Sequence, residues 1–96
     1  MDKKVKEYIE AIYNNYKKKA KEVKLKGKIT LEDIYDIISQ VYESFIAFNI
    51  KYVIINLFNE DKLYLYIELK TDKLIVNIWN KEEKDNLIIC HQHNNQ

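Results

Sequence analysis

The spacing of apolar residues changes near residue 50, and this change restricts the fold to a helical half followed by a strand half. Up to residue 49 apolar residues recur every three or four positions, whereas from residue 51 they alternate with polar ones. We expect helices at about residues 4–26 and 30–48, then strands at about 51–58, 62–70, 73–80 and 86–91. The expected fold class is α+β in the order ααββββ, a single domain over residues 1–96, with both helices packed on one face of a three- to four-stranded antiparallel meander.

Three residues are predicted to set the helix ends. Gly27, the only glycine, is expected just after the first helix with a positive φ. Thr30 is expected to cap the second helix together with Asp33, and Asn49 to end it in the left-handed conformation. The apolar stripe of this second helix is wide, so we expect it to be the most buried helix.

The strand at 62–70 determines the register, because each of its odd positions is aliphatic and one residue of slippage would expose them all. A loop at residues 59–61 and a turn at Thr71-Asp72 pair residue 55 with 65 and residue 67 with 76. The predicted core consists of Val5, Ile9, Ile12, Ile34, Ile38, Val41, Phe45, Val53, Ile55, Leu57, Leu63, Leu65, Ile67, Leu74, Val76 and Ile78.

The same register fills the opposite sheet face with aromatic residues, where an ordinary solvent face would carry Lys, Glu and Thr. Tyr and Trp are enriched at the centres of protein interfaces. We therefore predict a partner-binding surface there; the alternative is a second small core, covered by the first helix or by a curl of the sheet. The predicted partner-binding residues are Tyr52, Asn56, Tyr64, Tyr66, Asn77 and Trp79.

Charge is unevenly distributed along the chain. The net charge is +1, but ten of the sixteen lysines lie in the first 30 residues, and there is no arginine. This run is interpreted either as a solvated helix face that docks against the acidic half of the chain or as a track for a phosphate backbone. The second interpretation makes the chain a single-stranded nucleic-acid-binding protein that stacks bases on the sheet aromatics. The predicted electrostatic patch is Lys17, Lys18, Lys19, Lys21 and Lys24.

Two groups of residues resemble catalytic or metal-binding patterns, and neither predicts such a site. Glu68-Leu69-Lys70, with Asp61 across a hairpin, resembles the E-x-K pattern of metal-dependent nucleases, but no Pro-Asp precedes it and Asp61 lies in the turn. The C-H-x-H cluster at residues 90–93 cannot close a tetrahedral zinc shell without strain. We expect no cofactor, no metal and no enzymatic activity, with the nuclease as a second alternative function.

The predicted function is a non-catalytic protein-binding module acting through the aromatic sheet face, with a protein partner or a second copy of itself. Ile, Asn, Lys and Tyr make up 49 of the 96 residues. This composition is similar to that of small accessory proteins of AT-rich phages and mobile elements, and the resemblance implies an inhibitor or adaptor. No apolar run reaches the roughly 18–20 residues of a membrane span, and the first residues lack the apolar segment of a signal peptide, so we expect a cytoplasmic protein without membrane contact.

Overall fold

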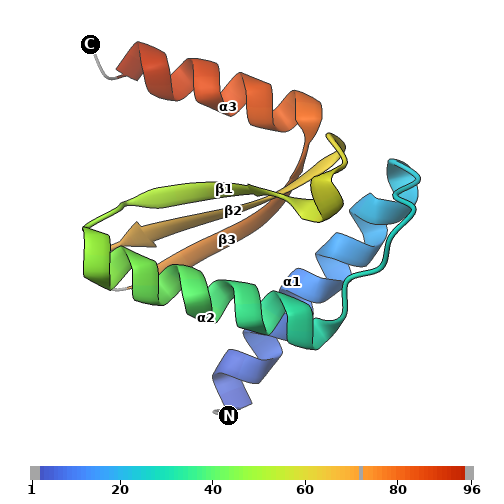
Figure 1. The fold of residues 1–96 in the computed structure, drawn as a ribbon, viewed down its shortest axis with the longest axis horizontal. Coiled ribbons are helices and arrows are strands. Elements are labelled where there is room, and N and C mark those ends of the chain that lie inside the picture. Colours follow the sequence, from blue (N-terminus) through green and yellow to red (C-terminus); the bar gives the residue numbers. More distant parts are fainter. Residues whose placement is uncertain (1–2, 72, 95–96) are drawn as a thin grey trace.

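The computed structural model describes residues 3–71 and 73–94, and for residues 90–94 it describes the backbone alone. Over these residues the fold is α+β, with three α-helices and a three-stranded antiparallel sheet. Two helices lie on one side of the sheet and the third on the other (Figure 1). The elements are α1 (Lys3–Glu22), α2 (Leu31–Phe48), β1 (Tyr52–Asn56), a 3₁₀ turn (Leu57–Asn59), β2 (Leu63–Lys70), β3 (Lys73–Asn80) and α3 (Lys81–Asn94).

The predicted register of the sheet is confirmed. The strands lie in the order β1-β2-β3, with Ile55 opposite Leu65 and Ile67 opposite Val76. The alternating residues of β2 fix this arrangement, because Leu65 and Ile67 are both completely buried towards the helices. The first strand is shorter than predicted, since the chain turns at Phe58, whose φ is 60°.

The core lies between the sheet and the pair α1 and α2, and most of the predicted residues belong to it. Val5 is an error, because its side chain is 43% exposed on the first turns of α1. Tyr16 and Ile29 are buried core residues that the prediction omitted. The buried cluster consists of Ile9, Ile12, Tyr16, Ile29, Ile34, Ile38, Phe45, Leu57, Leu63, Leu65, Ile67, Val76 and Ile78, with Val41, Val53, Ile55 and Leu74 partly buried against it.

The ends of α2 are confirmed as predicted. Asp33 donates its backbone N–H to Thr30 Oγ1 at 3.1 Å, and its carboxylate accepts the backbone N–H of Thr30 at 2.9 Å. This reciprocal capping satisfies two N–H groups that the first turn of a helix leaves without partners. Asn49 ends the helix with a φ of 53°, as expected for the non-glycine residue that best tolerates the left-handed region.

The predicted end of α1 is wrong. The helix stops at Glu22, Lys24 takes the left-handed conformation with a φ of 55°, and Gly27 has no positive φ. Gly27 instead lies close to the ring of Phe58. A Cβ atom there would lie 3.1 Å from the ring of Phe58, which is closer than ordinary van der Waals contact.

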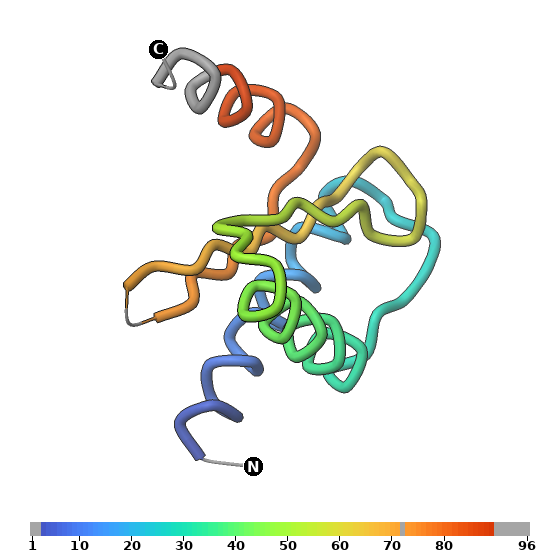
Figure 2. Tube along the Cα trace, turned by 60° about the vertical axis from the view of Figure 1, so that its left-hand side comes forward, coloured from blue at the N-terminus to red at the C-terminus, as the bar shows by residue number. Residues whose placement is uncertain are grey.

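The predicted fourth strand at 86–91 is also wrong, because these residues belong to α3. The helix starts with a reciprocal cap: Glu83 donates its backbone N–H to Asn80 Oδ1 at 2.9 Å, and the Asn80 amide donates to Glu83 Oε1 at 3.0 Å. This cap starts a helix directly after β3. A fourth strand would instead have needed a turn at this point to reverse the chain. Figure 2 shows α3 leaving the end of β3 on the side of the sheet opposite to α2.

Without a fourth strand, β3 is an edge strand, and a side chain from α1 satisfies part of its edge. The hydroxyl of Tyr8 donates to the carbonyl of Leu74 at 3.1 Å and accepts the backbone N–H of Val76 at 3.2 Å. Unpaired edge groups are templates for pairing with another chain. Tyr8 therefore closes this stretch of the edge and fixes α1 across β3.

Candidate binding surfaces

The aromatic face of the sheet is built from stacked rings. Tyr66 of β2 stacks on Trp79 of β3, with ring centroids 4.2 Å apart and planes 17° apart, and Tyr52 lies tilted against Tyr66 at 6.0 Å. The Tyr66 hydroxyl donates to Glu68 Oε1 at 2.5 Å. Burial, and then this hydrogen bond to a carboxylate, raise the pKa of Tyr66 above its usual value.

Helix α3 covers part of this face. The ammonium of Lys84 lies 4.1 Å from the ring centroid of Tyr64, a cation–π contact. An ion pair of 2.8 Å between Lys19 of α1 and Glu83 holds the start of α3 in place. The Tyr64 hydroxyl donates to Asp61; this hydrogen bond raises the pKa of Tyr64 to about 12 and lowers that of Asp61.

The cover divides the predicted partner-binding residues into two groups. Tyr64 and Tyr66 are only 3% exposed and Trp79 is half-buried, so a partner cannot reach the two tyrosines while α3 is in place. Tyr52, Asn56 and Asn77 are exposed. The six residues share one face as predicted, and the rings behave as a second small core. Its cover is α3, not the first helix or a curled sheet, and binding of a partner to this face stays a prediction.

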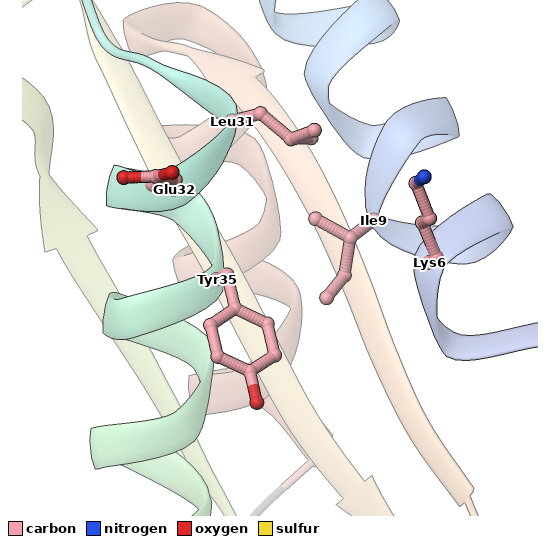
Figure 3. A pocket seen from close by; sticks show the side chains of 5 residues that line it. All are labelled: Lys6, Ile9, Leu31, Glu32 and Tyr35. Atoms are coloured by element: carbon pink, nitrogen blue, oxygen red, sulfur yellow. The ribbon is translucent and has the colours of Figure 1, made fainter. Parts of the chain in front are cut away.

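A second candidate surface is the groove between the N-terminal half of α1 and α2. In Figure 3, Ile9 of α1 and Leu31 of α2 point towards one another across this groove, with Tyr35 on the α2 side. Ile38 and Leu74 continue the lining in a neighbouring hollow of about 620 Å³. Four residues whose rings or aliphatic side chains are 37–45% exposed line the groove: Val5, Tyr8, Tyr35 and Tyr42.

The two walls of this groove carry opposite charges. Lys4 and Lys6 of α1 and Lys73 of β3 line one side, and Glu32 and Glu43 of α2 line the other. The contrast extends along both helices, because α1 contains seven lysines and three glutamates, whereas α2 contains four acidic residues and no lysine. Neither Glu32 nor Glu43 forms an ion pair with any residue that the structure describes.

The prediction that α2 is the most buried helix is not confirmed. It buries only Ile34, Ile38 and Phe45, as many residues as α1 buries. Ile46 and Phe48, further along α2, are 68% and 73% exposed. The reason is geometric: the apolar positions span a wider arc of α2 than the sheet and α1 together can cover.

The third candidate surface is a hollow of about 400 Å³ at the C-terminal end of α1, which we call the lysine hollow. It forms because the Tyr16 hydroxyl accepts the backbone N–H of Ile29 at 3.0 Å and so holds the returning segment 24–29 against the helix. Burial raises the pKa of Tyr16, which keeps this hydroxyl protonated. The lining residues are Tyr13, Tyr16, Lys17, Ala20, Lys21, Lys24, Leu25, Gly27, Lys28 and Ile29.

The predicted electrostatic patch is divided by this geometry. Lys17, Lys21 and Lys24 line the lysine hollow, joined by Lys28. Lys19 instead pairs with Glu83, and Lys18 is exposed and does not line the hollow.

The residues of the nuclease-like pattern are engaged in separate contacts. Glu68 accepts from Tyr66 and lies 3.8 Å from the ammonium of Lys70, while Asp61 accepts from Tyr64 and from the Asn56 amide at 3.4 Å. Within the described residues no three His, Cys, Asp or Glu side chains lie close enough to hold a metal ion. The side chains of Cys90, His91 and His93 lie outside the described residues. No helix in the described ranges is long and apolar enough to cross a membrane.

Comparisons of the chain with protein-family models, curated proteins and solved structures found no significant match.

Proposed function

We propose that the chain is a non-catalytic protein-binding module whose partner is a second copy of itself, bound through the groove between α1 and α2. The observation that carries this proposal is the combination of open tyrosines and opposite charges in one groove. Tyr8, Tyr35 and Tyr42 are each more than a third exposed, and acidic and basic side chains flank them. Contiguous exposed apolar surface with a polar rim marks an interaction site.

Tyrosine is suited to such a surface because its ring contributes apolar contact area at a small cost in side-chain entropy. In Tyr8 this cost is already reduced, since its hydroxyl is held by the backbone of Leu74 and Val76. Preorganised side chains bind more tightly because less freedom is lost on association. The groove thus presents the preorganised ring of Tyr8 on the α1 side and the rings of Tyr35 and Tyr42 on α2.

The charges favour a second copy of the chain as the partner. A two-fold axis that lies in the interface and runs parallel to the groove exchanges the two walls, so that α1 of each copy meets α2 of the other. Lys6 and Lys73 of one copy then face Glu32 and Glu43 of its partner. The net charge of +1 leaves almost no long-range repulsion between copies.

Two charge-reversed chains test this arrangement. One carries Lys4→Glu, Lys6→Glu and Lys73→Glu, so that both groove walls are acidic. The other carries Glu32→Lys and Glu43→Lys, so that both walls are basic. In sedimentation equilibrium each chain alone should be monomeric, because its copies repel, whereas the equimolar mixture should form a heterodimer. A parent chain that stays monomeric up to roughly 1 mM, the weak end of specific association, overturns the proposal. An all-acidic chain that still dimerises also overturns it.

The tyrosines are tested separately with Tyr42→Ala. Every substitution occurs twice in a symmetric dimer, so a loss of about 1–2 kcal/mol per copy weakens association by about 30- to 700-fold. The matched control is Phe48→Ala, which removes a ring that is 73% exposed on the same helix but does not line the groove. Equal weakening by both variants would contradict the groove as the interface. Thermal unfolding of the Tyr42→Ala monomer should stay close to that of the parent.

A further inference from the structure

We infer that the lysine hollow binds the phosphate backbone of a nucleic acid without sequence preference. This inference is independent of the groove, since the hollow lies at the other end of α1. Four lysines line it, Lys17 and Lys21 from the helix and Lys24 and Lys28 from the returning segment, and no acidic residue does. The positive field of the hollow is therefore not cancelled by its own lining.

The ammonium groups of these four lysines form no ion pair with an acidic side chain among the described residues. Lys21, Lys24 and Lys28 form no ion pair with any residue in the described ranges, and Lys17 lies over the ring of Tyr13, 4.9 Å from its centroid. In contrast, Lys19 on the same helix is engaged by Glu83. The interpretation of the whole lysine run as a face that docks against the acidic half of the chain therefore applies to Lys19 and not to the hollow.

The arrangement of the four lysines favours an extended polyanion over a single phosphate group. Lys17 and Lys21 lie one helical turn apart, about 6 Å along the axis, and Lys24 and Lys28 follow on a second segment across the hollow. A lysine ammonium is a compact point charge that donates hydrogen bonds to a phosphate oxygen from any direction. The chain has no arginine, which is the residue that forks onto guanine edges and carboxylates. Four lysines without an arginine are suited to contacts with the phosphate backbone of a nucleic acid. They are not suited to recognition of its base sequence.

The structure also shows which part of the earlier nucleic-acid prediction is not supported. The lysine hollow is built from α1 and segment 24–29, whereas Tyr66 and Trp79 share a sheet face with Tyr64, which Lys84 of α3 contacts. Tyr64 and Tyr66 are only 3% exposed, so bases cannot stack on them while α3 is in place. The inferred site therefore rests on charge alone, and its affinity should depend steeply on salt.

Fluorescence anisotropy with a labelled oligo-dT of about 20 nucleotides measures this binding. If the four lysines each neutralise one phosphate, the logarithm of the binding constant should fall with the logarithm of salt concentration with a slope of about −3, at about 0.7 per contact for a single strand. The test variant carries Lys17→Gln, Lys21→Gln, Lys24→Gln and Lys28→Gln. It should lose most of the affinity at low salt and most of the salt slope.

A matched control variant carries Lys3→Gln, Lys51→Gln, Lys70→Gln and Lys81→Gln, four exposed lysines that do not line the hollow. Both variants lose four positive charges, so an effect of net charge alone would lower both equally and overturn the inference. Polyglutamate of equal charge is the second probe. Binding as tight as that of oligo-dT would assign the hollow to acidic protein segments and overturn the inference, as would absence of oligo-dT binding at low salt.

Discussion

Replacing Tyr66 by alanine tests whether the aromatic sheet face is part of the folded core. The ring of Tyr66 is 3% exposed and stacks on Trp79 at 4.2 Å. A buried aromatic side chain removes about 150–250 Å² from water, which at about 25 cal/mol per Å² corresponds to an upper estimate of about 4–6 kcal/mol. Truncations of buried aromatic residues cost about 3–5 kcal/mol. We therefore expect Tyr66→Ala to lower the free energy of unfolding by about 4 kcal/mol.

The effect should be easy to measure, because a domain of this size is stabilised by only about 5–15 kcal/mol. At about 4–8 °C per kcal/mol, the melting temperature should fall by about 16–32 °C. Guanidinium unfolding followed by circular dichroism gives the free energy directly. Tyr66→Phe is the matched control: it keeps the ring and loses only the hydrogen bond to Glu68, at a cost of about 1–2 kcal/mol.

A second control, Tyr52→Ala, removes a ring on the same face that is 42% exposed, and it should cost clearly less. If the free energy of unfolding of Tyr66→Ala lies within about 0.5 kcal/mol of that of the parent, the spread that surface substitutions show, the ring is not a core residue.

Two further predictions concern alkaline stability and the end of α1. The pKa of Tyr64 is raised to about 12 from 10.0, so the folded state holds this hydroxyl protonated; the stability it contributes is complete below pH 10 and is lost as the pH rises from 10 towards 12. Urea unfolding across this range should show a steeper loss for the parent than for Tyr64→Phe, and equal losses would contradict the assigned hydrogen bond. Lys24 has a φ of 55°, which costs a non-glycine residue roughly 1–2 kcal/mol. Lys24→Gly should therefore raise the melting temperature, and a decrease would mean that Lys24 is not in the left-handed conformation.

The features that could be predicted from the sequence are those determined by neighbouring residues. The alternation along β2 fixes the strand register, and the pair Thr30 and Asp33 fixes the start of α2, because both signals lie within a few residues. The same kind of signal exists for α3 in Asn80 and Glu83. It was outweighed by the short apolar run Leu87-Ile88-Ile89, which suits a helix or a strand equally well.

The features that could not be predicted depend on contacts between distant segments. The end of α1 is set by the hydrogen bond between Tyr16 and Ile29, and Lys62 of the β1–β2 loop donates to the carbonyl of Lys24 at 3.5 Å. The groove was missed for a related reason: periodicity gives the width of an apolar stripe but not the area that its neighbours cover. Tyr42 of α2 shows this, because the position of α1 leaves it open in the groove.

The groove and the lysine hollow both lie on α1. Dimerisation through the groove therefore places two lysine hollows in one particle. Lys6 in the groove and Lys21 in the lysine hollow are separated by 15 residues, about 22 Å along the helix, so a partner in the groove leaves the hollow open. A dimer formed through the groove carries two such hollows, and an oligonucleotide long enough to reach both gains affinity through effective concentration. An oligonucleotide that spans only one hollow does not. Tyr42→Ala should therefore weaken the binding of a long oligo-dT to the level of a short one while leaving the short one unaffected, as measured by anisotropy at fixed salt. If the long and short oligonucleotides bind the parent dimer equally, the two hollows face directions that one strand cannot join.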